Sequence, residues 1–267
     1  MDKSRFMESA RGCLANGERL LEDAEMMEFG DPPLSSFFLA MIAQEEFAKG
    51  FLLCLVARDV IPWNSLIYRA TRDHTCKQLL AIIMEHVNPD DDEFGRRSED
   101  WRLKLDEHSK LLDALRETQN LVEVKKIWER IDAINESWDR LPRTVADAIN
   151  ILRHEKIGGW ESRSYWGEKP NYDRTAKDVG DGKAEREKQD AVYVRLSKNG
   201  EVIGVPGSVT PESATYAMDK AKRMGRLVKD LLAGQSGLFD YEKIESAFKA
   251  VFADLTAKIR PDTECSG

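Results

Sequence analysis

The stretch FFLAMIAQEEFAKGFLLCLVA, residues 37–57, decides the fold of this chain. It is apolar on almost every side, and its strongly polar side chains are Gln44, Glu45, Glu46 and Lys49. Each charge near the centre of a bilayer costs about 2.5–3.5 kcal/mol, and three of these side chains are charged. The stretch therefore predicts a buried helix of a soluble protein, with other helices packed around it and no membrane partner.

Helical periodicity extends outward from this stretch in both directions. It predicts helices over about 4–27, 34–59, 73–87, 101–118, 122–156, 210–233 and 240–259, with a short segment at 63–68. Pro142 is expected to bend or split the fifth of these helices. Asn199-Gly200 lies between two β-type runs and predicts a hairpin near 191–205, because Asn-Gly suits a turn with positive φ. The predicted fold is mainly all-α, with one small inserted β-hairpin.

Two stretches lack this periodicity. Residues 88–100 are acidic and rich in turn formers, and residues 158–189 mix Gly, Asp, Lys, Glu and Tyr, so both predict loops. The expected organisation is a helical bundle core over 1–157, a long loop over 158–189, and a hairpin with C-terminal helices over 190–260. These parts are expected to pack as a single domain.

Composition excludes several classes of protein. The 267 residues carry a net charge of −8, which argues against an extended, sequence-blind nucleic-acid binder but permits a small local phosphate site. The four cysteines form no CxxC pair, and no export signal is visible, which predicts a cytoplasmic protein with reduced thiols. The HExxH, GxSxG and phosphate-loop motifs are missing, and no Glu precedes a His by three residues. We therefore expect neither a metal centre nor a cofactor.

The polar island within residues 37–57 is the first candidate site. Glu45 and Lys49 are four residues apart and Glu46 and Lys49 are three apart, so these charges can meet on one helix face. Charged side chains are seldom placed in a buried helix without a partner or a function. Both a structural ion pair and a functional site remain open for this helix.

A second candidate cluster follows, made of Arg69, Arg72, His74 and Lys77. Histidine can take and give a proton near neutral pH, whereas Arg and Lys can hold a phosphate and stabilise charge that develops on it. A histidine with basic neighbours at a helix start is also common on an ordinary surface. The cluster alone leaves both interpretations open.

Together the two clusters resemble the AbiV family of abortive-infection proteins. The shared motifs are Leu39-Ala40-x4-Glu45-Glu46-x2-Lys49 and His74-x2-Lys77. The segment KQDAVYVRLSKNGEVIGVPGSVTPESA, residues 188–214, is also similar to the Tyr-Val strand, Pro and Thr-x-Glu helix start found late in that family. The resemblance spans about residues 10–223 and implies a HEPN-like helical bundle.

The wider HEPN group contains many metal-independent endoribonucleases whose signature is Arg, four to six residues, then His. Arg69-x4-His74 fits this signature and overlaps the family motif. Arg102-x5-His108 also fits and ranks second because no family motif adjoins it. Ala70 stands where the group usually has a polar residue. The resemblance also implies a homodimer with one Arg–His set from each chain.

The resemblance implies a bacterial anti-phage protein, or toxin, that cleaves RNA, with a phage-encoded activator as a possible partner. His74 would act as base on a ribose 2′-OH or as acid on the leaving oxygen, and Arg69 would hold the phosphate. The remaining candidates are assigned to substrate binding or to support of these groups: Arg72, Lys77, Glu45, Glu46 and Lys49.

Two other functions remain open at this point. The same bundle could be a binding module without turnover that recognises a phage protein or a nucleotide and inhibits translation by contact. Alternatively, the protein could be a helical scaffold in which the charges of the polar island, Glu45 and Lys49, form a purely structural pair.

Overall fold

The computed structural model describes residues 2–27, 33–161, 170–204, 206, 209–235 and 240–257. The described chain is mainly all-α, as helical periodicity predicted. Its contacts divide the protein into two compact units, one formed by Met1–Asn88 with Arg143–Gly267 and the other by Pro89–Pro142. The organisation as a single domain stays a prediction, and each unit is described by itself.

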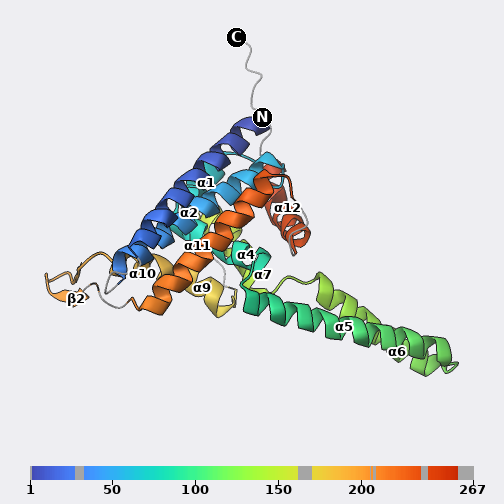
Figure 1. Ribbon diagram of the computed structural model, residues 1–267. Coiled ribbons are helices and arrows are strands. Elements are labelled where there is room, and N and C mark those ends of the chain that lie inside the picture. The colour runs from blue at the N-terminus through green and yellow to red at the C-terminus, as the bar shows by residue number, and fades with distance from the viewer. Residues whose placement is uncertain are drawn as a thin grey trace, which may run out of the picture. The chain divides into compact units, whose positions relative to one another are not determined.

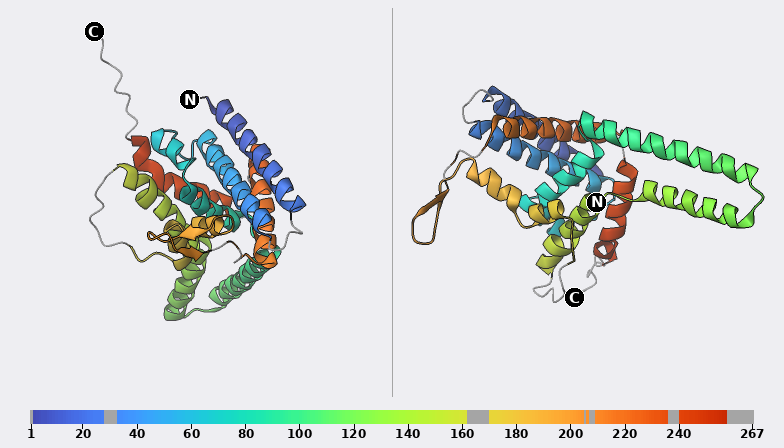
Figure 2. Two further views of the ribbon diagram at one scale, coloured as in Figure 1. Left: turned by 90° about the vertical axis from the view of Figure 1, so that its left-hand side faces the viewer. Right: turned by 90° about the horizontal axis from the view of Figure 1, so that it is seen from below.

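The first unit is built around one central helix, α2 (Leu34–Ala57), as its uniformly apolar sequence predicted. This helix contacts α1 (Lys3–Met26), α4 (His74–Val87), α10 (Lys183–Asp190) and α11 (Pro211–Leu232). Figures 1 and 2 show α1, α2 and α11 side by side. The other helices of the unit are α3 (Ser65–Ala70), α7 (Arg143–Asn150), the π-helix η1 (Ile151–Ile157), α8 (Gly158–Glu161), α9 (Arg174–Gly180) and α12 (Tyr241–Ala257).

Glycines allow the helices to approach α2 closely at Phe47, whose side chain is fully buried. A Cβ atom at Gly17 of α1 would lie 2.4 Å from the Phe47 ring, and one at Gly225 of α11 would lie 3.0 Å from it. Because α1 and α11 both meet the same aromatic ring, α2 is fixed in position between them. This fixes the face of α2 that carries the candidate site.

The prediction of a long loop over 158–189 is wrong for the part of this segment that the structure describes, because that part contains α8, α9 and α10. The Asp173 side chain caps α9 by accepting from the amides of Thr175 and Ala176, and Gly182 takes a left-handed φ of 82° just before α10. The helices α9 and α10 have 7 and 8 residues. Two turns are too few for a periodic pattern to stand out in the sequence.

The second unit consists of α5 (Asp91–Glu117) and α6 (Leu121–Asp139). The prediction of a loop over 88–100 is wrong, because α5 already begins at Asp91. The Asp90 side chain caps this helix. The first turn carries three acidic residues, Asp91, Asp92 and Glu93, whose negative charges interact favourably with the positive N-terminal end of the helix dipole. Acidic residues that suggested a loop therefore start a helix. The predicted break at Pro142 is confirmed, since α6 ends at Asp139 and α7 begins at Arg143.

The predicted hairpin near 191–205 is confirmed. Strand β1 (Arg195–Leu196) pairs antiparallel with β2 (Val202–Gly204), and Gly200 in the turn has a φ of 83°. The hairpin extends away from the helices of its unit (Figure 2). Among the helices that the structure describes, none combines the length and the apolar character needed to cross a membrane.

Candidate active site

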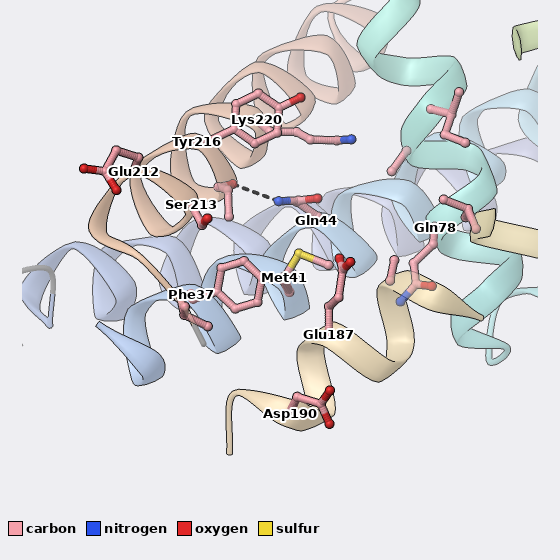
Figure 3. A pocket seen from close by; sticks show the side chains of 16 residues that line it. Phe37, Met41, Gln44, Gln78, Glu187, Asp190, Glu212, Ser213, Tyr216 and Lys220 are labelled. Carbon is pink, nitrogen blue, oxygen red and sulfur yellow. Dashed lines mark hydrogen bonds between the residues drawn. The ribbon is translucent and has the colours of Figure 1, made fainter. Parts of the chain in front are cut away.

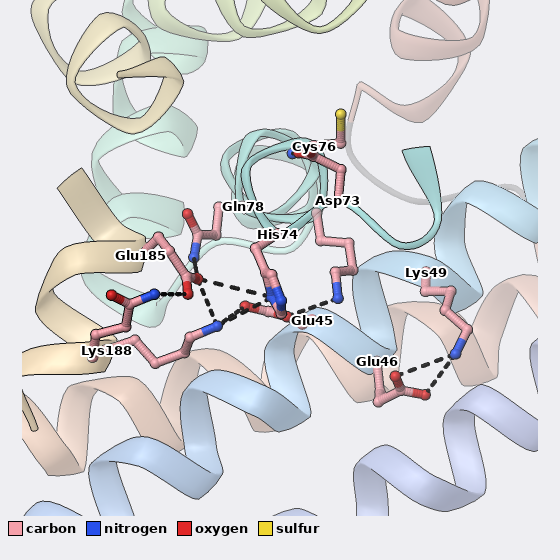
Figure 4. Close-up of polar contacts among 11 residues, drawn as sticks. Glu45, Glu46, Lys49, Asp73, His74, Cys76, Gln78, Glu185 and Lys188 are labelled. Atoms are coloured by element: carbon pink, nitrogen blue, oxygen red, sulfur yellow. Dashed lines mark hydrogen bonds and ion pairs between the residues drawn. The ribbon is translucent and has the colours of Figure 1, made fainter. Parts of the chain in front are cut away.

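Five side chains from three helices meet in one centre, here called the Glu45 centre (Figure 4). Glu45 of α2 lies in the middle. Its Oε2 is 2.6 Å from His74 Nδ1 and 2.8 Å from Lys77 Nζ, both on α4. Its Oε1 is 2.6 Å from Lys188 Nζ on α10, and this ammonium is also 2.6 Å from Glu185 Oε2. The centre thus joins residues that are far apart in the sequence.

Local structure explains how each helix presents these groups. The Asp73 side chain accepts from the Cys76 amide and starts α4, which makes His74 the first residue of the helix and puts Lys77 one turn later. Glu185 and Lys188 are likewise one turn apart on α10, where they form an ion pair. Two one-turn pairs therefore meet at a single carboxylate of α2.

The electrostatics of the Glu45 centre are balanced. The side chains of Glu45, Lys77 and Lys188 are 3%, 8% and 4% exposed. Burial acts to raise the pKa of the Glu45 carboxyl, but the neighbouring Lys77 and Lys188 ammonium groups outweigh burial and lower this pKa. The charges of the two glutamates and two lysines cancel when His74 is neutral. Full pairing is what allows these charges to be buried.

His74 occupies the boundary between this buried centre and the solvent, with 49% of its side chain exposed. Lys188 Nζ is 3.2 Å from His74 Nδ1, but the shorter contact of Nδ1, 2.6 Å, is with the Glu45 carboxylate. An ionised carboxylate can only accept, so we assign the Nδ1 proton to the hydrogen bond with Glu45. This tautomer leaves Nε2 with its lone pair, which is the atom that can accept a proton from a substrate.

The predicted phosphate ligands lie immediately before His74 in the chain. Arg69 lies in the last turn of α3 and Arg72 lies in the turn between α3 and α4, and both are exposed. The Arg72 guanidinium is 5.9 Å from the centroid of the Tyr68 ring, and Tyr68 is 51% exposed. Lys77 differs from these residues because it is buried against Glu45. It is therefore placed to support the carboxylate and not to reach a substrate.

Glu46 and Lys49 form a separate pair at 3.1 Å, apart from the Glu45 centre (Figure 4). Lys49 also interacts with Cys13 of α1, and Cys13 and Glu46 together outweigh burial and raise the pKa of Lys49. Glu45 pairs with Lys77 and Lys188 across the fold, while Lys49 pairs with Glu46 on its own helix. Of the two pairings that the spacing allowed, the described ion pairs contain Glu46 with Lys49. The structural pair of Glu45 with Lys49 that the scaffold alternative requires is not among them.

The second Arg–His match lies on α5 in the other unit. Arg102 pairs with Glu99 at 2.6 Å, and the His108 ring centroid is 5.4 Å from that of Trp138. Both interactions are of the kind expected on a helix surface. A centre comparable to that around His74 is not formed at His108 by the contacts that the structure describes.

Sequence reasoning missed Glu185 and Lys188, because both lie in the segment that was predicted to be a loop. The Glu185-x2-Lys188 spacing was the available signal, but the same spacing is common on solvated helices. It also missed Tyr68, whose exposed ring lies next to Arg72. This contact becomes evident only when α3 and the following turn are seen together.

A pocket of about 720 Å³ adjoins the centre along α2, α4 and α10 (Figure 3). The Gln78 amide lines it and donates to Glu185 at 3.3 Å, which connects pocket and centre. Glu187, Asp190 and Glu212 also line it, whereas its lining lysine, Lys220, is already paired with Glu85 at 2.7 Å. This charge disfavours a phosphate, so a phosphate is expected near Arg69 and Arg72 and not in this pocket.

The fold and the site together define a class: an all-α bundle with a histidine, held by a buried carboxylate, at the start of a helix. The HEPN_AbiV family model, described as AbiV, matches residues 6–226 of the chain. The chain therefore belongs to the AbiV family of HEPN-type abortive-infection proteins, and the matched span contains every residue of the Glu45 centre. Neither the curated proteins nor the solved structures give a match.

Proposed function

We propose that this protein is a metal-independent endoribonuclease that acts in abortive infection. The observation that carries the proposal is the geometry of His74, whose Nδ1 is held by a buried carboxylate while half of the side chain faces solvent. A histidine oriented in this way is suited to general acid–base catalysis, because its tautomer is fixed and its other nitrogen is open to a substrate.

In the proposed reaction, His74 Nε2 accepts the proton of a ribose 2′-OH, and the resulting oxygen attacks the adjacent phosphorus. The bond from phosphorus to the 5′-oxygen breaks, and that oxygen takes up a proton. The products are a 2′,3′-cyclic phosphate and a 5′-hydroxyl end. Arg69 and Arg72 stabilise the negative charge that develops on the phosphate. Glu45 and Lys77 position the imidazole and do not contact the RNA.

RNA binding in this proposal is local, because the net charge of −8 gives the chain no general attraction for a polyanion. Tyr68 supplies an exposed ring on which a base can stack, beside the guanidinium group of Arg72. We further propose that the active form is a symmetric homodimer in the cytoplasm, in which the His74 of the second copy protonates the leaving oxygen. A phage-encoded protein is the proposed trigger.

The test is incubation of wild-type protein and of His74→Ala with total bacterial RNA in EDTA, followed by analysis of the fragment ends. Wild type is expected to give cyclic-phosphate ends and His74→Ala intact RNA. His108→Ala is the matched control, because it removes the histidine of the second Arg–His match, and it should cleave like wild type. Cleavage that requires added Mg²⁺ or Mn²⁺ would refute the proposed mechanism.

A second candidate is a binding module that recognises a phage protein or a nucleotide and inhibits translation without cleaving RNA. The 720 Å³ pocket beside the Glu45 centre favours it, since a preformed pocket of this size is typical of ligand sites. The two functions differ in one measurement. If cells with His74→Ala keep full protection against phage, the binding function is favoured. If protection is lost although the variant stays folded, the catalytic function is favoured.

A further inference from the structure

The α10 helix places one ammonium group at the meeting point of three metal-type ligand atoms. Lys188 Nζ lies 2.6 Å from Glu45 Oε1, 2.6 Å from Glu185 Oε2 and 3.2 Å from His74 Nδ1. The ligand atoms that His74, Glu45 and Glu185 offer all lie within 4.8 Å of one another. One imidazole and two carboxylates form a donor set that divalent transition metals accept.

We infer that the Lys188 ammonium occupies the position at which a divalent cation would bind, so that the protein's own cation closes a His–Glu–Glu metal site. Lys188 is therefore the residue that excludes metal from the Glu45 centre. The Lys188 side chain is 4% exposed, and this leaves little room for an ion beside it. The inference rests on this geometry and not on the proposed ribonuclease activity.

Charge supports the same conclusion. With both lysines present, the charges of Glu45 and Glu185 are fully compensated, so a divalent ion would add an excess positive charge to a buried centre. Without Lys188, one negative charge is left uncompensated next to the His74 ring. A bound cation would then replace the lost ammonium and take the Nδ1 lone pair of His74, whose single ring proton would sit on Nε2.

Lys77 provides a matched control within the same centre. It is buried to a similar extent and pairs with the same carboxylate, at 2.8 Å from Glu45 Oε2. However, its ammonium is paired with Glu45, whereas that of Lys188 is paired with both Glu45 and Glu185. Removing Lys77 therefore deletes the same charge but leaves Lys188 in the metal position.

The experiment uses Co²⁺ as the probe, with full-length wild type, Lys188→Ala, Lys188→Met and Lys77→Ala. Calorimetry measures affinity, and visible absorption reports nitrogen and oxygen ligands around Co²⁺. We expect the Lys188 variants to bind one ion per chain on the order of 10–100-fold more tightly than wild type and Lys77→Ala. Adding Glu185→Gln to Lys188→Ala should abolish this gain, and Co²⁺ should raise the melting temperature of the Lys188 variants alone.

Two results would overturn the inference. The first is stoichiometric Co²⁺ binding by wild type that Glu185→Gln removes. The second is weak binding by both Lys188 variants. If these variants are unfolded without metal, Co²⁺ is expected to restore their helical circular dichroism, because metal binding and folding are then coupled; failure to do so also counts against the inference. Since no RNA is present, a negative result here is distinct from a failure of the proposed function.

Discussion

His74 Nδ1 lies 2.6 Å from Glu45 Oε2, and this single hydrogen bond connects a carboxylate that is 3% exposed to an imidazole that is 49% exposed. The buried partner is surrounded by protein, whereas the outer partner is open to a substrate. Substitution of the two residues should therefore have different effects. Replacing Glu45 is expected mainly to lower the stability of the fold, and replacing His74 is expected mainly to lower activity.

Glu45→Ala should lower the free energy of unfolding by about 3–5 kcal/mol, because it leaves the Lys77 and Lys188 ammonium groups buried without their carboxylate. Urea unfolding followed by circular dichroism measures this loss. Glu46→Ala, next to it on α2, removes one partly exposed ion pair with Lys49 and should cost about 1 kcal/mol or less. Equal losses for the two variants would contradict the assignment of Glu45 as the central charge.

Tyr68→Ala should raise the KM for an RNA oligonucleotide by about 5–150-fold and leave kcat nearly unchanged. Stacking of one base on an aromatic ring contributes about 1–3 kcal/mol to binding, and this ring does not touch the reacting atoms. Steady-state cleavage rates over a range of RNA concentrations separate the two constants. Tyr193→Ala is the control, since Tyr193 is 61% exposed but lies outside the candidate site. A similar rise in KM for both variants would argue against a stacking role for Tyr68.

Two glycines of α1 should respond to alanine in opposite directions. Gly17→Ala places a methyl group 2.4 Å from the buried Phe47 ring and should destabilise the protein by about 1–3 kcal/mol. A Cβ at Gly12 meets nothing within 4 Å, so Gly12→Ala should stabilise the helix by about 0.5–1 kcal/mol. Thermal melting of both variants measures the difference. If Gly17→Ala were as stable as Gly12→Ala, the close contact of α1 with α2 would be wrong.

Asp240 should contribute stability that is lost in acid. His86 Nε2 lies 3.2 Å from Asp240 Oδ2, and the hydrogen bond from His86, helped by Lys243, outweighs burial and lowers the pKa of Asp240 to about 2. A pKa lowered on folding stabilises the protein above the unfolded value of 3.8, and this contribution disappears as the pH falls through 2.

Asp240→Asn tests this contribution without disturbing the backbone, since Asn tolerates the positive φ of 55° at this position. At about pH 7 the variant should be less stable than wild type by about 1–2 kcal/mol, with allowance for solvent screening. The difference should vanish near pH 2, as measured by urea unfolding across the pH range. A difference that stays constant with pH would exclude the carboxylate as its source.

The long helices and the family motifs were predictable because both are local in sequence. The apolar side chains on nearly every side of residues 37–57 predicted a central helix, and α2 is central. The helix start near Asp73 followed from periodicity, and α4 begins at His74 with Asp73 as its cap. The family resemblance, and not periodicity, suggested that the glutamates of residues 37–57 support the basic cluster. Pairing across the fold was not predictable, because Glu45 had a sequence neighbour of opposite charge, Lys49, and that neighbour is used by Glu46 instead.

The errors have a common physical origin. Residues 88–100 and 158–189 are polar, and helices that bury few side chains leave no apolar period to detect. The α5 helix buries none of its residues fully, and α10 buries Lys188 alone. From the sequence, a short polar helix with one lysine on its inner face is predicted to be exposed to solvent. In the structure the ammonium group of this lysine, Lys188, forms two ion pairs inside the protein.

Because α10 supplies Glu185 and Lys188, the Glu45 centre depends on the order in which the chain is made. A chain that has emerged from the ribosome only as far as α4 already holds Glu45, His74 and Lys77, but the second ammonium is 143 residues beyond Glu45. Synthesis must pass residue 188 before Oε1 of Glu45 gains its ammonium partner. A protein truncated before α10 would therefore lack a complete centre.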